Sequence, residues 1–133
     1  MAQMRKQILV VEDNRDVREF ISFVLAKEDY ILHEAHDGLA ALALAREFKP
    51  DLILLDIMMP GISGLEVLQE IRRDKDLEVR GALVLIITAK SQPQDIETAL
   101  MHGATSYLIK PFRPAALVEK VYRLLHPPTV LQE

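Results

Sequence analysis

The chain has 133 residues, the length of one domain, and a formal net charge of −4 at pH 7. Half of its residues are apolar and 27% are charged, which excludes a disordered or collagen-like protein. Its Lys and Arg residues are scattered rather than massed in one segment. Because the chain offers no basic field, we expect no direct binding to nucleic acid.

There is no cysteine, which excludes disulfides, thiolate metal sites and thiol nucleophiles and suits a reducing cytoplasm. The polar residues 1–7 lead into an apolar run that is shorter than a signal-peptide core. No stretch approaches the roughly 20 apolar residues of a membrane span. We therefore expect a cytoplasmic protein that makes no contact with a membrane.

The first half of the chain alternates strand and helix patterns. Ile8–Val11 is continuously apolar, which predicts a strand covered by helices on both faces. A helix follows, with a buried stripe at the spacing i, i+3, i+4, i+7, i+8. The residues of this stripe are Val17, Phe20, Ile21, Val24 and Leu25. Tyr30–Ala35 alternates less cleanly and contains His33 and Glu34, which indicates an edge strand.

A second helix is predicted from about Gly38 to Glu47, followed by an interior strand at Leu52–Leu55. The inward-facing residues of this helix are Leu39, Leu42 and Ala43. A third helix spans about Gly64 to Arg73, and Leu83–Ile87 is again a continuously apolar interior strand.

Pro93 in a first turn and Gly103 at a left-handed cap delimit the fourth helix. Ser106–Ile109 supplies the fifth strand, and Pro114 begins the fifth helix, which ends before Pro127. Alternating strands and helices of this length require a parallel sheet with right-handed crossovers. The sequence therefore predicts one doubly wound, three-layer α/β domain.

Polar side chains follow the predicted strands where each strand ends. Glu12 and Asp13 follow the first strand and Asp56 follows the third. The carboxyl ends of parallel strands meet at one edge of the sheet, where open α/β folds bind ligands. Two carboxylates about 5 Å apart there would repel by roughly 3 kcal/mol at an effective dielectric near 20, and a cation would remove that cost. Oxygen ligands without Cys or convergent His predict Mg²⁺ rather than a caged Ca²⁺.

Asp56 is the candidate nucleophile, because a carboxylate is already ionised at pH 7 and attacks phosphorus without a general base. Residues 57–61 form an irregular loop, which predicts that Asp56 is not buried. Lys110, at the end of the fifth strand, offers a point charge to a phosphoryl oxygen and a partner to Asp56 when no phosphate is present. Thr88 offers a hydroxyl to the same phosphoryl group.

Nearly the whole chain resembles the receiver domain of bacterial two-component response regulators. The resemblance rests on four segments in the expected order: ILVVEDN, DLILLDIMMPGISGLEVL, LIITA and GATSYLIKPF. It implies a flavodoxin-like fold with strand order 2-1-3-4-5 and five helices. It also implies that Asp56 is the phosphoryl acceptor, with Lys110 and Thr88 as phosphate-binding residues. Thr88 and Tyr107 would be the switch pair.

The same resemblance implies a Mg²⁺ site made by Glu12, Asp13, Asp56 and the backbone carbonyl of Met58. The donor would be the phosphohistidine of a sensor histidine kinase or phosphotransfer protein. The domain would catalyse its own phosphorylation and slow dephosphorylation rather than act as a conventional enzyme. Phosphorylation would change the face made by the fourth helix, fifth strand and fifth helix, and thereby control a downstream protein, an output domain or a homodimer.

Two neighbouring positions bear on the lifetime of the phosphoryl group. Met58 and Lys90 lie two residues after Asp56 and Thr88, and in the family such positions flank the path of an attacking water. Our hypothesis is that Met58 hinders this water and that Lys90 interacts with the phosphoryl group.

Three other functions would use a similar fold or the same domain. A phosphatase of the haloacid dehalogenase type needs an acidic residue two positions after its nucleophile, where this chain has Met58. A flavodoxin-like flavin site needs hydroxyls and glycines after the first strand, where this chain has Glu12 and Asp13. A receiver that acts as an interaction or dimerisation module independently of phosphorylation stays open.

We expect residues 1–126 to form the receiver domain and residues 127–133 to be a short tail or the start of a linker. No helix-turn-helix or catalytic effector pattern follows Leu125. The sequence is therefore consistent with a stand-alone receiver and with the amino-terminal piece of a longer regulator.

Overall fold

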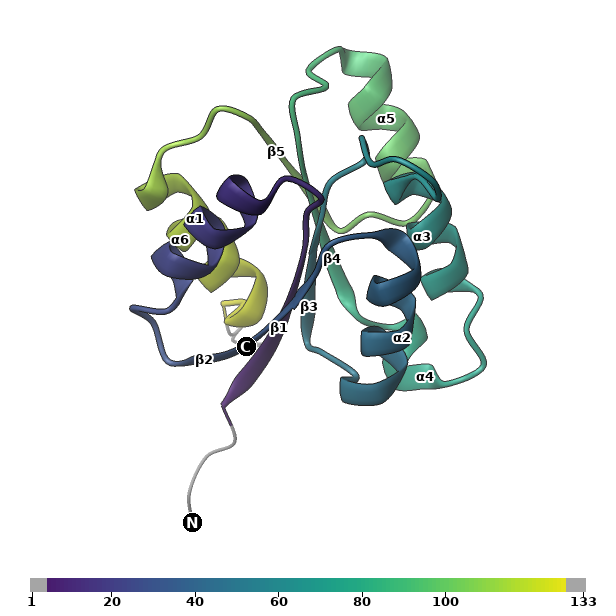
Figure 1. Ribbon diagram of the computed structural model, residues 1–133, viewed down its shortest axis with the longest axis horizontal. Coiled ribbons are helices and arrows are strands. Elements are labelled where there is room, and N and C mark those ends of the chain that lie inside the picture. The colour runs from purple at the N-terminus through teal and green to yellow at the C-terminus, as the bar shows by residue number, and fades with distance from the viewer. Residues whose placement is uncertain (1–4, 129–133) are drawn as a thin grey trace, which may run out of the picture.

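The computed structural model describes residues 5–128, and Figure 1 shows the arrangement of their secondary structure. Five strands and six helices lie within these residues. The strands are β1 (Lys6–Val11), β2 (Tyr30–Ala35), β3 (Leu52–Leu55), β4 (Leu83–Thr88) and β5 (Ser106–Ile109). The helices are α1 (Arg15–Leu25), α2 (Gly38–Phe48), α3 (Gly64–Arg72), α4 (Leu77–Arg80), α5 (Pro93–Met101) and α6 (Pro114–Leu125).

The five strands form one parallel sheet in the order β2-β1-β3-β4-β5. Figure 1 shows α1 and α6 on one face of the sheet and the other four helices on the opposite face. The predicted three-layer, doubly wound fold and its strand order are therefore confirmed. The prediction of an edge strand at β2 is also confirmed, because β2 pairs with β1 alone.

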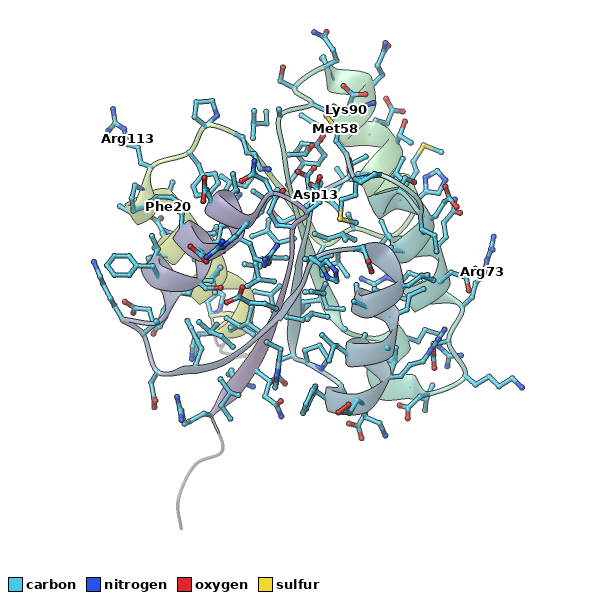
Figure 2. All side chains as sticks on the ribbon, viewed as in Figure 1. Asp13, Phe20, Met58, Arg73, Lys90 and Arg113 are labelled. Atoms are coloured by element: carbon cyan, nitrogen blue, oxygen red, sulfur yellow. The ribbon has the colours of Figure 1, made fainter. Side chains whose placement is uncertain are left out.

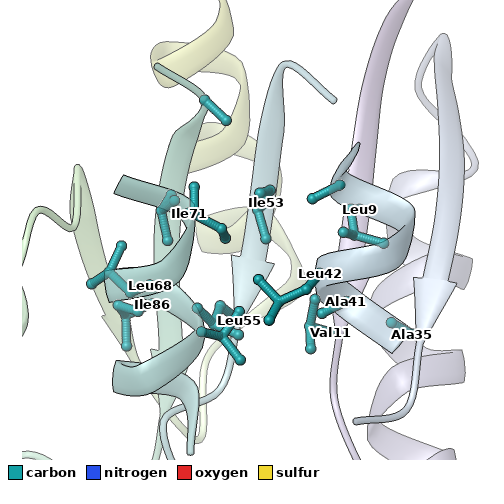
Figure 3. Packing of buried hydrophobic residues seen from close by; sticks show 14 of the residues in the cluster. Leu9, Val11, Ala35, Ala41, Leu42, Ile53, Leu55, Leu68, Ile71 and Ile86 are labelled. Atoms are coloured by element: carbon teal, nitrogen blue, oxygen red, sulfur yellow. The ribbon is translucent and has the colours of Figure 1, made fainter. Parts of the chain in front are cut away.

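Both faces of the sheet are buried, which explains why its strands are continuously apolar. Successive residues of a strand point to opposite faces. β1 thus places Leu9 and Val11 toward α2 and α3, and Ile8 and Val10 toward α1 and α6. Figure 3 shows Leu9 and Val11 packed with Leu42 of α2 in the first of these two clusters.

Side-chain caps set the start of most helices. A side-chain oxygen of the residue before each of four helices accepts a hydrogen bond from a backbone N–H of the first turn, which would otherwise lack a partner. These residues are Asn14, Asp37, Ser63 and Asp76. Pro93 begins α5, and Gly103 just after α5 has a φ of 104°, a conformation that favours glycine, as predicted.

The predicted count of five helices is wrong, because α4 lies between the predicted third helix and fourth strand. α4 forms where Asp76 accepts hydrogen bonds from the backbone N–H groups of Glu78 (2.8 Å) and Val79 (3.4 Å). A single turn of four residues is too short to display helical periodicity, so the pattern could not reveal it.

Two of the predicted buried stripes are partly wrong. Leu39 is 68% exposed, and α2 instead buries a face of small residues with Leu42. The buried residues of α2 are Gly38, Ala41, Leu42 and Ala45. A Cβ at Gly38 would lie 2.9 Å from Val67 Cγ2 of α3, so α2 approaches its neighbour too closely for a larger side chain. In α1, Phe20 is 43% exposed and packs beside Phe112.

Within residues 5–128, no helix combines the length and the apolar character needed to cross a membrane.

Candidate functional site

The predicted site residues gather at the carboxyl edge of the sheet. Glu12 follows β1 and Asp56 follows β3. Thr88 ends β4 and Lys110 follows β5. These four strands are consecutive neighbours in the sheet, so side chains far apart in sequence meet at one place, as the strand pattern predicts. Figure 2 shows Asp13, which is next to Glu12, at this end of the molecule.

Backbone hydrogen bonds continue the sheet past the ends of its strands and align the site residues. The N–H of Asp56 donates to the carbonyl of Val11 (3.3 Å), and the N–H of Lys110 donates to the carbonyl of Thr88 (2.8 Å). The segments that follow neighbouring strands therefore remain in register, which brings their side chains within reach of one another.

Three carboxylates converge at this edge. One oxygen from each of Glu12, Asp13 and Asp56 lies within 4.8 Å of the other two. Glu12 and Asp56 are buried, whereas Asp13 is exposed and faces solvent. Carboxylate oxygens at this spacing fit a hard divalent cation, and the exposed side leaves room for water in its coordination shell. The residues present thus suit a metal ion.

Lys110 pairs with two of these three carboxylates. Its Nζ lies 2.7 Å from Asp56 Oδ2 and 2.5 Å from Glu12 Oε1. Burial alone would lower the pKa of the Lys110 ammonium, but the hydrogen bonds to Asp56 and Glu12 outweigh burial and raise the pKa. Lys110 is therefore fully charged at neutral pH. Its pairing with Asp56 agrees with the prediction, and its pairing with Glu12 was not predicted.

Glu12 is held on both carboxylate oxygens. Oε1 accepts from Lys110, and Oε2 accepts from the backbone N–H of Asn14 at 3.1 Å. Burial raises the pKa of the Glu12 carboxyl, and these two hydrogen bonds oppose the rise only in part. The carboxylate thus sits where ionisation is costly unless a cation is close.

The prediction that Asp56 is not buried is wrong, because its side chain is only 7% exposed. The reason is the close approach of α3. A Cβ at Gly64 would lie 2.1 Å from the Asp56 carbonyl oxygen, so only glycine allows α3 to begin there. Asp56 Oδ1 accepts a hydrogen bond from the N–H of Met58 at 2.9 Å. Both oxygens of Asp56 are therefore partnered.

Thr88 lies beside this cluster with an unused hydroxyl. The residue is completely buried, and its Oγ1 has no hydrogen-bond partner among the described residues. Buried polar groups without a partner are rare, and each one calls for an explanation such as a missing ligand. The hydroxyl is available to a group that binds at Asp56.

Tyr107 connects β5 to the loop before α5. Its hydroxyl donates to the backbone carbonyl of Lys90 at 2.8 Å, while its ring packs half-buried against the core on that side of the sheet. Burial raises the pKa of the Tyr107 hydroxyl. The hydroxyl is therefore neutral and remains a donor over the physiological pH range.

A shallow groove of about 530 Å³ adjoins the cluster between the loops that follow β3 and β4. Met58, which is 54% exposed, and Lys90 both line this groove, and both are labelled in Figure 2. The two positions predicted to influence the attack of water thus border the same groove, and their effect on hydrolysis stays a prediction.

Sequence reasoning missed the residues that shape the site without reacting. Gly64 gives a faint signal, because a glycine in the first turn of a helix is unfavourable unless the chain must pass closely. Asn14 could have been found as a helix cap that precedes an apolar stripe. Nothing in the pattern reveals that Lys110 binds Glu12, since β3 and β4 lie between their two strands in the sheet.

Known proteins share this arrangement. A family model described as the response regulator receiver domain matches residues 8–122. The DNA-binding response regulator MtrA of Mycobacterium tuberculosis is 39% identical over 121 residues, covering 91% of this chain and 51% of that protein. MtrA of Mycobacterium leprae is 39% identical over 118 residues, covering 89% of this chain and 50% of that protein. The chain thus spans about half the length of the curated relatives it matches.

Among solved structures, the chemotaxis protein CheY4 of Vibrio cholerae superimposes with a TM-score of 0.85 and 29% sequence identity. The match covers 91% of this chain and 99% of CheY4. The sequence match, the fold and the acidic edge of the sheet agree, and the chain belongs to the family of response regulator receiver domains.

Proposed function

We propose that Asp56 accepts a phosphoryl group from the phosphohistidine of a sensor histidine kinase or a phosphotransfer protein. The observation that carries this proposal is the buried Asp56 carboxylate, which lies against two further carboxylates and the Lys110 ammonium at the ligand-binding edge of the sheet. The unpartnered hydroxyl of Thr88 supports it, because a phosphoryl group on Asp56 would provide the missing acceptor.

The proposed cofactor is Mg²⁺, held by Glu12, Asp13, Asp56 and the backbone carbonyl of Met58. An all-oxygen set with an exposed side suits this ion, which retains several waters when it binds to proteins. When bound, Mg²⁺ would screen the carboxylate charge from the approaching phosphoryl oxygens.

In the proposed reaction, a carboxylate oxygen of Asp56 forms a bond to phosphorus while the bond between phosphorus and the donor's imidazole nitrogen breaks. The electron pair of the broken bond remains on the imidazole nitrogen. Lys110 starts on Asp56 Oδ2 and moves to an oxygen of the transferred group, so its charge follows the developing negative charge. Asp56 needs no general base because a carboxylate oxygen carries no proton that must be removed before it attacks phosphorus.

The proposed switch follows from the added charge. A phosphoryl group contributes about two negative charges and three acceptor oxygens, which attract the Thr88 hydroxyl and Lys110. The shift of Thr88 changes the space beside Tyr107, whose hydroxyl bonds the Lys90 carbonyl before α5. The face made by α5, β5 and α6 then changes, and a partner that prefers the changed face favours phosphorylation in return.

We propose that residues 1–126 form the receiver unit and that residues 127–133, most of which lie outside the described residues, are a short tail or the start of a linker. The receiver would act in the cytoplasm on a downstream protein, an output domain or a second copy of itself. This chain matches only about half the length of the relatives named as DNA-binding, and its acidic charge supports protein partners rather than direct contact with DNA.

The test is incubation with a small-molecule phosphodonor and Mg²⁺, followed by intact mass measurement. We expect a gain of about 80 Da, one phosphoryl group, that is absent in Asp56→Asn and after chelation of the metal. Asp51→Asn is the matched control, because Asp51 is an exposed aspartate at the opposite end of β3. A gain that persists in Asp56→Asn would refute Asp56 as the acceptor.

The alternative is a module that binds partners independently of phosphorylation. Partner capture by phosphorylated and unmodified protein discriminates between the two functions. Equal capture of the same partner by both forms, and by Asp56→Asn, would support the alternative, whereas a preference for one form supports the switch.

A further inference from the structure

Arg18 connects three parts of the molecule next to the acidic cluster. It lies on the second turn of α1, and its side chain is only 17% exposed. Its Nη1 donates to the backbone carbonyl of Glu12 at 2.8 Å, and its Nε donates to Glu34 Oε1 of β2 at 3.1 Å. The guanidinium therefore ties α1 to the segment after β1 and to the neighbouring strand.

The Glu12 carbonyl lies where the sheet ends and the chain turns toward Asp13. The N–H of Glu12 still donates to the carbonyl of Ala35, the last residue of β2, at 3.1 Å. β2 offers no further residue for the Glu12 carbonyl, which lies just past that point, and Arg18 satisfies it instead. A charge-assisted hydrogen bond at this carbonyl fixes the direction in which the chain leaves β1.

That direction decides where the acidic side chains point. Glu12 is also fixed by its own side chain, through Lys110 and the N–H of Asn14. Asp13 is exposed, and its carboxylate depends on the backbone for its position in the cluster. Two side chains join this backbone to α1: Asn14 caps the helix at the far end of the segment, and Arg18 anchors the Glu12 carbonyl at the near end.

We propose that Arg18 is a positioning residue for divalent-cation binding: it holds the segment Glu12–Asn14 so that the Asp13 carboxylate faces those of Glu12 and Asp56. The inference rests on the proposed Mg²⁺ site and extends it to a residue that does not touch the ion. Glu34 contributes by holding the other side of the guanidinium.

Electrostatics and positioning make opposite predictions for removal of Arg18. A positive charge close to a cation site repels the cation, so its loss would strengthen Mg²⁺ binding if charge were its only contribution. Loss of an anchor would weaken Mg²⁺ binding, because the ligand segment would then have to be ordered when the ion binds. Whether the Kd for Mg²⁺ rises or falls in the variant therefore distinguishes the two effects.

The experiment is calorimetric titration of Mg²⁺ into wild type, Arg18→Ala and Arg15→Ala, well below the unfolding temperature of each protein. We expect about a tenfold higher Kd in Arg18→Ala, the lower end of the range for partners outside the direct ligand set. Arg15→Ala is the matched control, because it removes the same charge from the same helix, yet Arg15 is 79% exposed and pairs with Glu19 within α1. Its Kd should stay equal to that of wild type or fall slightly.

A second readout uses the phosphorylation reaction. In Arg18→Ala, the Mg²⁺ concentration at half-maximal rate should rise by the same factor, while the rate at saturating Mg²⁺ stays that of wild type. A general loss of structure would lower the saturating rate instead. Arg18→Lys keeps the charge, but a single ammonium cannot bridge the Glu12 carbonyl and Glu34 as the guanidinium does, so its Kd should also rise. This variant decides the question if Arg18→Ala does not fold.

The outcomes are distinguishable. Wild-type protein that does not bind Mg²⁺ would overturn the proposed metal site and the inference with it. Wild-type binding with an unchanged or lower Kd in both Arg18 variants would overturn the positioning inference alone and leave the metal site standing.

Discussion

Two partly buried cations lie at opposite edges of the sheet and are held in different ways. At the carboxyl edge, Lys110 is bonded by the side-chain carboxylates of Glu12 and Asp56. At the amino edge, Arg72 at the end of α3 donates to three backbone carbonyls, those of Gly103, Arg80 and Ala82. Burial lowers the pKa of Arg72, whereas the carboxylates raise that of Lys110.

The difference separates a fixed contact from an exchangeable one. The carbonyls around Arg72 lie at the end of α4, just after α5 and just before β4, and all three accept from this one guanidinium. The carboxylates around Lys110 can bind a metal ion in place of the ammonium, and the ammonium can then pair with a phosphoryl oxygen. Arg72 thus fastens the segment just after α5 to the end of α3.

The largest expected effect is the loss of Arg72. Arg72→Ala leaves three carbonyls without their donor, and we expect the free energy of unfolding to fall by about 3 kcal/mol. Urea denaturation with and without Mg²⁺ measures this, and Mg²⁺ should not restore the loss. The control is Arg73→Ala, because the neighbouring Arg73 is 71% exposed and points to solvent in Figure 2. A comparable loss in both variants would contradict a specific contribution of Arg72.

Removal of the Lys110 side chain should lower the free energy of unfolding by less, and Mg²⁺ should restore most of that loss. Lys110→Ala leaves two buried carboxylates without their cation, but Glu12 can take up a proton because burial already raises its pKa. We expect a loss of about 2 kcal/mol without Mg²⁺ and recovery of most of it at saturating Mg²⁺, since a bound ligand stabilises the folded state. Lys75→Ala, at an exposed site after α3, should show neither effect. If Mg²⁺ stabilises Lys110→Ala no more than wild type, the Lys110 contact is not one that a metal ion can replace, and it does not differ from the Arg72 contact in this respect.

The residues of the site were easier to predict than the residues that hold backbone segments in place, for a physical reason. Residues that end parallel strands must meet at one edge, so the positions of Glu12, Asp56 and Lys110 follow from strand order alone. Arg72 and Gly64 act through backbone atoms of other segments, and no side-chain pattern records which carbonyl lies within reach. Their contributions appear only when the packing of α3 is known.

The errors of the helix predictions have the same origin. Leu39 has the right spacing for a buried face but lies on the exposed side of α2, because close packing against α3 selects the face that carries Gly38 and Ala41. Hydrophobicity indicates that a helix is amphipathic, whereas the distance to its neighbour decides which face is buried. The irregular loop after Asp56 failed as a sign of exposure because burial there depends on Gly64.

The lifetime of the phosphoryl group on Asp56 tests whether water can reach the site at the carboxyl edge of the sheet. Met58→Ala removes a half-exposed side chain from the groove beside Asp56, and we expect loss of phosphate to accelerate about threefold, less than 1 kcal/mol of barrier. Lys90→Ala should also change the rate if the ammonium contacts the phosphoryl group. Met101→Ala, 78% exposed on α5, is the control. Unchanged lifetimes in Met58→Ala and Lys90→Ala would end the hypothesis that these residues govern hydrolysis.

The smallest expected effect is a pH dependence of stability that originates in Glu12. Its pKa is raised in the folded state by burial, so the folded protein binds more protons than the unfolded chain between the unfolded value, near 4.5, and the raised value. Stability contributed by this group therefore falls as pH rises through that window. In Glu12→Gln this component disappears, so the stability of the variant should decline less steeply with pH than that of wild type. Urea denaturation across the window without metal measures the slope, and equal slopes would mean that Glu12 carries no excess proton in the fold.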